Sequence, residues 1–195
     1  MVLADQDSAG SSSGGPAEDF SDLDLLEFLQ TGVCDRTGRN LLIVVSRNYP
    51  AKMLRTDRVY RYLRHKVDSI SAAPYSILWY HTTSSYWKNC PSMRWLWRTY
   101  ESLPSQYRDN LCRVFMVHCD LSMWCAMMAV CPWLTSDFWQ KVEWVSRVEF
   151  LWDELDKKQT PVPSFVADHD RVLEDAPLLD YGLIANKEAM GPTPM

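Results

Sequence analysis

Residues 41–45, Leu41-Leu42-Ile43-Val44-Val45, decide the fold class of this chain of 195 residues. They form a continuous, β-favouring apolar run that follows a turn at Thr37-Gly38-Arg39. A strand with one solvated face alternates apolar and polar residues, whereas an uninterrupted apolar run is typical of a parallel strand covered on both faces. The stretch therefore predicts a central strand of a parallel sheet.

The same pattern recurs three times further along the chain, with helical periodicity between the runs. Strands are predicted over residues 76–81, 113–117 and 142–145. Helices are predicted over residues 57–70, from Pro91-Ser92 to Pro104, and over 123–131 and 148–155. Repeated strand–helix units build a parallel sheet with helices packed on it. We therefore expect an α/β fold, a three-layer sandwich whose mostly parallel sheet of four to five strands carries helices on both faces.

A single domain without internal repeats is expected, flanked by polar ends. Low hydrophobicity and acidic, Ser/Gly-rich composition predict disorder at the amino terminus. The expected organisation is a disordered acidic leader over residues 1–19, a short amphipathic helix and a turn over 20–37, the globular domain over 38–183 and a frayed tail over 184–195.

The net charge of −5 is unevenly distributed along the chain. Residues 1–24 contain six acids and no base, whereas residues 36–66 contain nine bases and one acid, Asp57. Within the basic segment, four arginines recur every three residues beside the apolar face of a predicted helix: Arg55, Arg58, Arg61 and Arg64. Such a segment suits the phosphates of a membrane surface, a nucleotide or an acidic partner, or it is simply a solvated helix face.

The motifs of several enzyme classes are missing from the sequence. It contains no G-x-G-x-x-G, no G-x-x-x-x-G-K-[ST] and no G-x-S-x-G. His81 follows a predicted strand without a paired carboxylate, which favours a structural hydrogen-bonding role. Asp168-His169-Asp170 is expected in an exposed loop, in a chain that is extended after Pro161. We therefore expect no enzymatic activity, no metal and no cofactor.

The cysteines and the apolar runs indicate a cytoplasmic protein. The six cysteines include no C-x-x-C pair, and the chain opens without a signal peptide, so reduced thiols are expected. The longest apolar run, residues 123–134, is far shorter than the roughly 20 residues of a membrane-spanning helix. Nucleic-acid binding is not expected, because the chain outside the leader is nearly neutral.

The chain is rich in bulky apolar residues, with nine tryptophans and nine methionines. The helix predicted over Met123 to Cys131, capped by Ser122 and ended by Pro132, has no polar face. Such a helix is fully buried, covers an apolar cavity or contacts a membrane. Methionine suits a wall that accepts flexible acyl chains, although aromatic and methionine stripes also build ordinary cores.

Five segments resemble the CRAL-TRIO lipid-binding domain in its divergent branch, which includes the BCH domains of Rho-GTPase regulators and the ganglioside-induced differentiation-associated proteins. Together they extend over residues 38–183, and the last of them is similar to plant-type members of this branch. The segments are RNLLIVVSRNYP (39–50), SILWYHT (76–82), SLPSQYRDNLCRVFMVH (102–118), KVEWVSRVEFLWDEL (141–155) and VPSFVADHDRVLEDAPLLDYG (162–182).

The resemblance implies a mobile helix that gates an apolar pocket. By position, this gate helix includes Met123, Trp124, Met128 and Cys131, with Trp133 just beyond it. In the classical phosphatidylinositol-transfer branch, a carboxylate precedes the third strand and a lysine opens the fourth, and Asp109 and Lys141 occupy similar places here. The residues expected to bind the ligand are Trp79, Asp109, Phe115, Met127, Met128, Val130, Phe138 and Lys141.

Two functional hypotheses follow. The first is a non-enzymatic module that binds, senses or transfers a phospholipid or other hydrophobic ligand in a gated pocket, with transient membrane contact during trafficking or signalling. The alternative is a scaffold that binds a small Rho-type GTPase or its regulator, as the kinship with BCH domains implies. An open interior favours the first hypothesis, and a collapsed interior favours the second.

Overall fold

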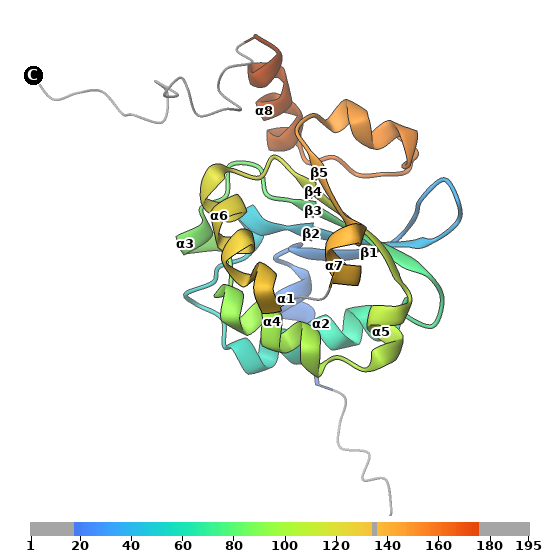
Figure 1. Ribbon diagram of the computed structural model, residues 1–195, viewed down its shortest axis with the longest axis vertical. Helices are drawn as coiled ribbons and strands as arrows, with labels where there is room; N and C mark the ends of the chain where they lie inside the picture. The colour runs from blue at the N-terminus through green and yellow to red at the C-terminus, as the bar shows by residue number, and fades with distance from the viewer. Residues whose placement is uncertain (1–17, 134–135, 176–195) are drawn as a thin grey trace, which may run out of the picture.

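The computed structural model describes residues 18–133 and 136–175, in which a five-stranded sheet is packed between helices (Figure 1). The order of the strands in the sheet follows the chain, β1-β2-β3-β4-β5. β1 is antiparallel to β2, and the remaining neighbours are parallel. The strands are β1 (Leu29–Cys34), β2 (Asn40–Val45), β3 (Tyr75–Tyr80), β4 (Leu111–Val117) and β5 (Val142–Val145). The predicted α/β fold with a mostly parallel sheet is confirmed.

Alternation along each central strand divides its side chains between two apolar cores, because successive residues of a strand point to opposite faces. On β2, Leu41, Ile43 and Val45 belong to one core, and Leu42 and Val44 face the other. β3 pairs with β2, β4 pairs with β3, and the side chains of both strands divide in the same way. Both faces of the sheet are therefore buried, as the continuous apolar run predicts.

One face of the sheet is covered by the helices that connect its parallel strands. Each crossover leads to the next strand in the same direction, and right-handed crossovers of that kind place their helices on one face. Figure 1 shows α2, α4 and α5 together below the sheet, with α6 beside α4. These helices are α2 (Thr56–Asp68), α4 (Met93–Ser102), α5 (Ser105–Asp109), α6 (Leu121–Val130) and α7 (Ser136–Lys141).

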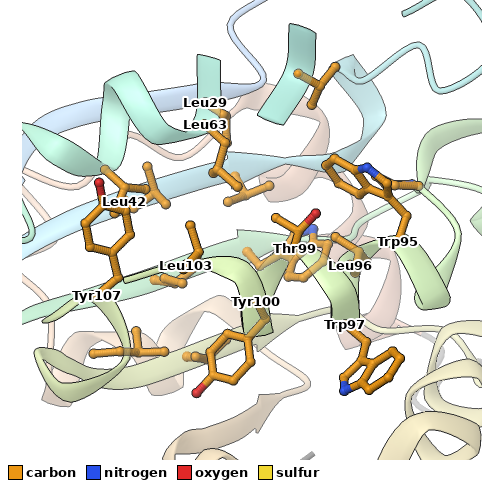
Figure 2. A pocket seen from close by; sticks show the side chains of 18 of the residues that line it. Leu29, Leu42, Leu63, Trp95, Leu96, Trp97, Thr99, Tyr100, Leu103 and Tyr107 are labelled. Atoms are coloured by element: carbon orange, nitrogen blue, oxygen red, sulfur yellow. The ribbon is translucent and has the colours of Figure 1, made fainter. Parts of the chain in front are cut away.

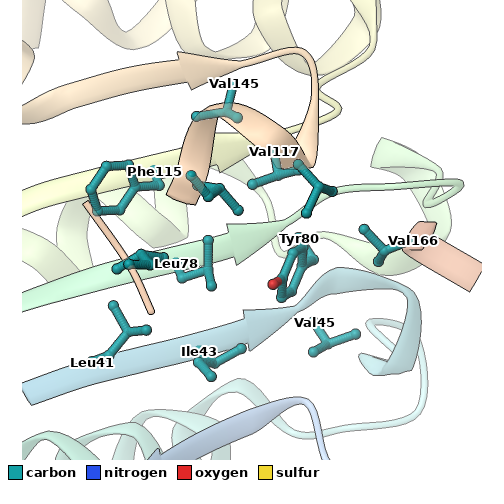
Figure 3. Packing of buried hydrophobic residues seen from close by; sticks show 12 residues of the cluster. Leu41, Ile43, Val45, Leu78, Tyr80, Phe115, Val117, Val145 and Val166 are labelled. Atoms are coloured by element: carbon teal, nitrogen blue, oxygen red, sulfur yellow. The ribbon is translucent and has the colours of Figure 1, made fainter. Parts of the chain in front are cut away.

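The opposite face is covered by the carboxyl-terminal part of the described chain. The 3₁₀ helix η3 (Val148–Asp153) and α8 (Ser164–Asp175) lie over β2, β3 and β4. Leu151 of η3 and Val166 of α8 are fully buried against the sheet. Figure 3 shows Val166 close to Tyr80 and Val45 at one end of this core.

The amino-terminal segment adds a third cluster beside α2. The short helix α1 (Ser21–Asp24) inserts Leu23 against Tyr62 of α2, and both residues are fully buried. The Tyr62 hydroxyl donates a hydrogen bond of 2.6 Å to Asp24. Three further short elements, η1 (Ser46–Asn48), α3 (Tyr86–Asn89) and η2 (Cys131–Trp133), connect the larger ones.

Four local predictions are wrong. The short amphipathic helix expected at the start of residues 20–37 ends at Asp24. It is followed by β1, an antiparallel edge strand, which the sequence pattern did not predict because it is irregular around Gly32. The helix predicted over 148–155 is the 3₁₀ helix η3. The segment after Pro161 contains α8, on which Val166 and Leu173 lie seven residues apart on one side and are both buried, Val166 against the sheet. The cap of α6 is Asp120, whose carboxylate accepts from Met123 N at 2.9 Å, and Ser122 donates to that same carboxylate.

The turn from β1 to β2 is held by the buried carboxylate of Asp35. It accepts hydrogen bonds from the amide and hydroxyl of Thr37 and from the amide and Nε of Arg39, at 2.7 to 3.0 Å. Burial alone raises the pKa of Asp35, but these bonds to Thr37 and Arg39 outweigh it and hold the pKa below its usual value. Gly38 supplies the positive φ of 81° that closes the turn.

We expect Asp35→Asn to lower the free energy of unfolding by about 1–3 kcal/mol at neutral pH. A lowered pKa stabilises the fold above the unfolded pKa of about 3.9, and this contribution is lost as the pH falls through the folded value. The difference between wild type and variant in urea unfolding should therefore be largest near pH 7 and shrink below about pH 4. A difference independent of pH would contradict this account.

Candidate ligand-binding cavity

An apolar cavity of about 220 Å³ lies between the sheet and the helices that connect its strands. Its floor is formed by even-numbered residues of β2 and odd-numbered residues of β3, and its walls by α2 and α4. Figure 2 shows Leu96 and Thr99 of α4, and Leu103 directly after it, facing Leu63 and Leu42 across this space. The cavity extends along the strands, from Tyr75 where β3 begins to Trp79 near its end.

The α4 wall follows from the helical period. Met93, Leu96, Tyr100 and Leu103 recur at three- and four-residue spacing, so they lie on one side of the helix. Ser92 caps α4 by accepting a hydrogen bond from Trp95 N. The sequence predicts this helix but does not identify it as the main wall of the cavity.

Few polar groups line the cavity. The hydroxyls of Tyr49 and Tyr107 are buried, and neither has a hydrogen-bond partner in the described chain. Trp79 donates its indole N–H to the Ser46 hydroxyl at 2.5 Å, and Asn89 donates to the carbonyls of Arg47 and Tyr49. Arg108 is the one charged residue in the described lining.

Burial shifts the pKa of several titratable groups in and beside the cavity. Burial raises the pKa of the phenols of Tyr49 and Tyr75, and it raises the pKa of the neighbouring Cys90 thiol to about 12. These groups are therefore neutral near pH 7. The cavity offers apolar surface and hydrogen-bond donors but no activated nucleophile or base.

Among the residues expected to bind a ligand, three line this cavity: Trp79, Met127 and Phe138. Phe115 does not, because β4 turns it to the opposite face, where it is 1% exposed in the other core. Met128 does not line the cavity either, because it lies on the outer side of α6 and is 43% exposed. The side chain of Val130 lies outside the described part of the structure.

The pair expected from the phosphatidylinositol-transfer branch lies near one end of the cavity without lining it. Asp109 is exposed at the end of α5. Lys141 donates from Nζ to the carbonyl of Arg108 at 3.2 Å and pairs with Asp137 at 2.7 Å. Lys141 is therefore occupied in joining α7 to α5, and this arrangement does not present a carboxylate and an ammonium to the cavity.

The apolar helix α6 is buried on one side and exposed on the other. Met123 and Met127 pack inward and are almost fully buried. Leu121, Trp124 and Met128 are 73%, 45% and 43% exposed. Of the other residues assigned to the gate, Cys131 is half-buried, and the side chain of Trp133 lies outside the described part. The helix is thus neither an ordinary core helix nor an ordinary amphipathic one.

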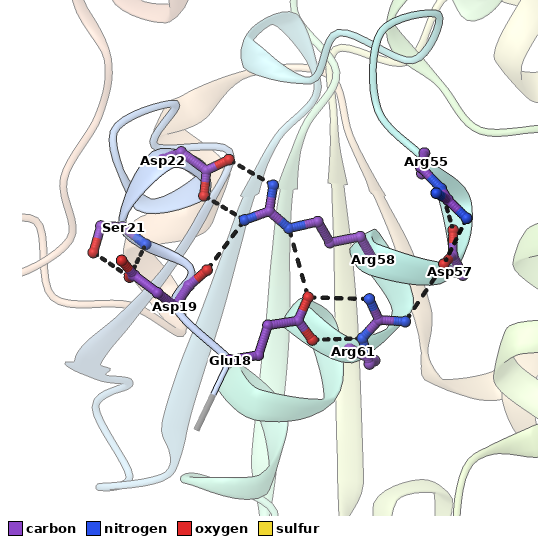
Figure 4. Close-up of polar contacts among 8 residues, drawn as sticks. All are labelled: Glu18, Asp19, Ser21, Asp22, Arg55, Asp57, Arg58 and Arg61. Carbon is purple, nitrogen blue, oxygen red and sulfur yellow. Dashed lines mark hydrogen bonds and ion pairs between the residues drawn. The ribbon is translucent and has the colours of Figure 1, made fainter. Parts of the chain in front are cut away.

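The arginines of the basic surface differ in their surroundings. Arg58 pairs with Asp22 through two contacts of 2.7 Å, and Arg61 pairs with Glu18 at 2.5 and 3.0 Å (Figure 4). Arg55 lies 3.4 Å from Asp57, and Arg64 is exposed. Acidic residues in and just before α1 therefore cover part of the predicted basic surface.

Asp170, one of the acids singled out in the sequence, forms structural contacts with His118 at the carboxyl end of β4. His118 lies between the Thr82 hydroxyl at 2.9 Å and the Asp170 carboxylate at 3.1 Å. Asp170 also accepts from Val148 N, so it joins α8 to η3 and the sheet. The expectation of an exposed loop here is wrong, because residues 168–170 lie within α8. No group of residues arranged to bind a metal occurs in the described chain.

The sequence shows similarity to known proteins. A family model described as "Divergent CRAL/TRIO domain" matches residues 38–172. The chain is 29% identical over 155 residues to "Ganglioside-induced differentiation-associated-protein 2" of Rattus norvegicus and 28% identical over 158 residues to "Protein GDAP2 homolog" of Drosophila melanogaster. These matches cover 79% and 78% of the chain but 31% and 28% of those relatives, so the chain spans less than a third of their length.

We expect the cavity to bind a small apolar molecule such as benzene, since a cavity of about 150 Å³ lined by aliphatic and aromatic residues does so elsewhere. Leu96→Trp should abolish this binding, because the indole fills the space beside α4. Arg94→Trp, on the exposed side of the same helix, is the control and should bind as wild type does. Thermal-shift measurements with benzene check this, and equal stabilisation of all three proteins would refute the cavity.

Proposed function

The chain belongs to the divergent CRAL/TRIO domain family, and on that basis we propose that it is a non-enzymatic module that binds a hydrophobic ligand between its sheet and helices. The observation that carries this proposal is the cavity between β2, β3 and α4, whose lining is apolar apart from a few hydroxyl, amide and guanidinium groups. Pockets for lipid-like ligands combine such apolar walls with a small number of placed polar groups.

We further propose that α6 is the gate of this cavity. Met127 lines the cavity from inside, while Trp124 and Met128 present apolar surface outside on the same helix. A helix with both properties can exchange its contacts with protein for contacts with a membrane, which is how a ligand would enter from a bilayer. Trp124 and Met128 lie four residues apart and share a face. In the described residues, no helix is long and apolar enough to cross a bilayer, so the proposed membrane contact is peripheral.

The alternative hypothesis, a scaffold for a small Rho-type GTPase, does not require a cavity. The open interior favours ligand binding, as anticipated from the sequence. The basic face of α2 binds carboxylates of this chain's own amino-terminal segment, and an acidic protein partner would have to displace them. A GTPase partner, a role in trafficking or signalling and a cytoplasmic location stay predictions.

We expect the double variant Trp124→Ala/Met128→Ala to bind liposomes at least about threefold more weakly than wild type while remaining folded, because both side chains are about half exposed and contribute little to the core. Phe150→Ala is the matched control, since Phe150 is 55% exposed in η3, away from α6. Co-sedimentation with liposomes measures binding, and circular dichroism checks folding. Unchanged binding by the double variant, or severe unfolding of it, would remove α6 as a gate.

A further inference from the structure

The two ends of the cavity differ in charge. Tyr49 lies at the end where β2 finishes, and Tyr107 and Arg108 lie in α5, at the end where β3 and β4 begin. Each end carries one buried tyrosine hydroxyl, but the cationic side chain of the lining is found at the α5 end. The α5 end is therefore the place where a polar head of a ligand would be recognised.

Tyr107 is fixed through its backbone carbonyl, and its side-chain hydroxyl has no hydrogen-bond partner in the described chain. Its carbonyl accepts a hydrogen bond of 2.9 Å from the Tyr75 hydroxyl, which fixes α5 to the start of β3. The Tyr107 side chain is 3% exposed, and its own hydroxyl lacks a partner in the described chain. Figure 2 shows this hydroxyl beside Leu42, on the cavity side of α5. Buried hydroxyls are nearly always hydrogen-bonded, so an unpaired one that lines a cavity indicates a missing acceptor.

Arg108 supplies a positive charge without a counter-charge in the described chain. Its guanidinium forms no ion pair within 4.0 Å there. Burial raises the pKa of the Tyr100 phenol and the Arg108 charge opposes this rise, so the guanidinium lies within electrostatic reach of Tyr100, another lining residue. Two acids act on the same phenol, but Asp137 is paired with Lys141 and Asp109 is exposed to solvent.

We propose that the cavity takes a single-chain carboxylic acid, with its carboxylate on Arg108 and Tyr107 and its hydrocarbon tail along β2 and β3. The proposal rests on the function proposed above and names the chemical class of the ligand. A guanidinium and a phenolic O–H are both donors, and together they match the acceptor-only chemistry of a carboxylate. A neutral ester or alkane would leave the Arg108 charge uncompensated beside apolar walls.

The size of the cavity restricts the ligand further. Scaled from a cavity of about 150 Å³ that holds benzene, a space of about 220 Å³ holds roughly nine non-hydrogen atoms. Hexanoic acid fits within that limit, whereas a phospholipid with two acyl chains does not fit unless α6 moves. The apolar surface that would meet the tail is provided by Leu42, Val44, Leu63, Ile77 and Leu96.

Isothermal titration calorimetry of the full chain with hexanoate, methyl hexanoate and butyl phosphate, which all fit the size limit, tests the proposal. We expect wild type to bind hexanoate about tenfold or more tightly than methyl hexanoate. Arg108→Gln should abolish this preference while keeping its affinity for the ester, and Tyr107→Phe should weaken hexanoate binding about threefold to tenfold. Arg94→Gln removes an arginine charge on the exposed side of α4, outside the cavity lining, and it should bind hexanoate as wild type does.

Several results would overturn the proposal. Equal or tighter binding of the ester by wild type, an acid preference that survives in Arg108→Gln, or tighter binding of butyl phosphate would each exclude a carboxylate site. If Arg108→Gln does not fold, Arg108→Lys replaces it, and this variant should retain part of the acid preference because it keeps the charge but not the planar fork. Binding of none of the three ligands would instead refute the proposed function itself.

Discussion

The structure depends on the alternation of side chains along its parallel strands. Because all the crossovers advance in one direction, the connecting helices gather on one face of the sheet, and the carboxyl-terminal segments cover the other. Leu41, Ile43 and Val45 therefore pack into a solid core, whereas Leu42 and Val44, their immediate neighbours, face the cavity. A change of register by one residue would exchange the two faces and destroy both.

The two faces of the sheet differ: one packs into a filled core that stabilises the fold, and the other borders the cavity. The core beneath η3 and α8 is filled by residues such as Phe115 and Leu151, which are almost fully buried and meet other side chains. On the opposite face, α4 does not pack directly against β2 and β3, and the cavity lies between them. The chain belongs to the divergent CRAL/TRIO domain family. This division agrees with the proposal that one face of the sheet stabilises the fold and the other binds a ligand.

The sequence predicted the parts of this arrangement that depend on local pattern. The continuous apolar runs identify the central strands, and residues 142–145 match β5 to the residue. β1 and α8 were missed because an irregular edge strand and a helix behind two prolines gain most of their stability from the surface they meet. The sequence pattern did not predict which side chains of a strand face the cavity. Phe115 is as apolar as its neighbours Val114 and Met116, and only the pairing of the strands shows that it points away from the cavity. The key polar residues of the cavity, Tyr49, Tyr107 and Arg108, carry no motif, although the spacing of Leu96, Tyr100 and Leu103 could have identified the wall that faces them.

The central claim is that a hydrophobic ligand occupies the space between the sheet and α4. Native mass spectrometry of the chain purified from cells, followed by lipid extraction and identification, tests it most directly. The account predicts a population of protein that is heavier by the mass of one ligand, and loss of that species in Leu96→Trp but not in Arg94→Trp. A clean ligand-free mass under every mild condition, together with no uptake of lipid from liposomes, would contradict it.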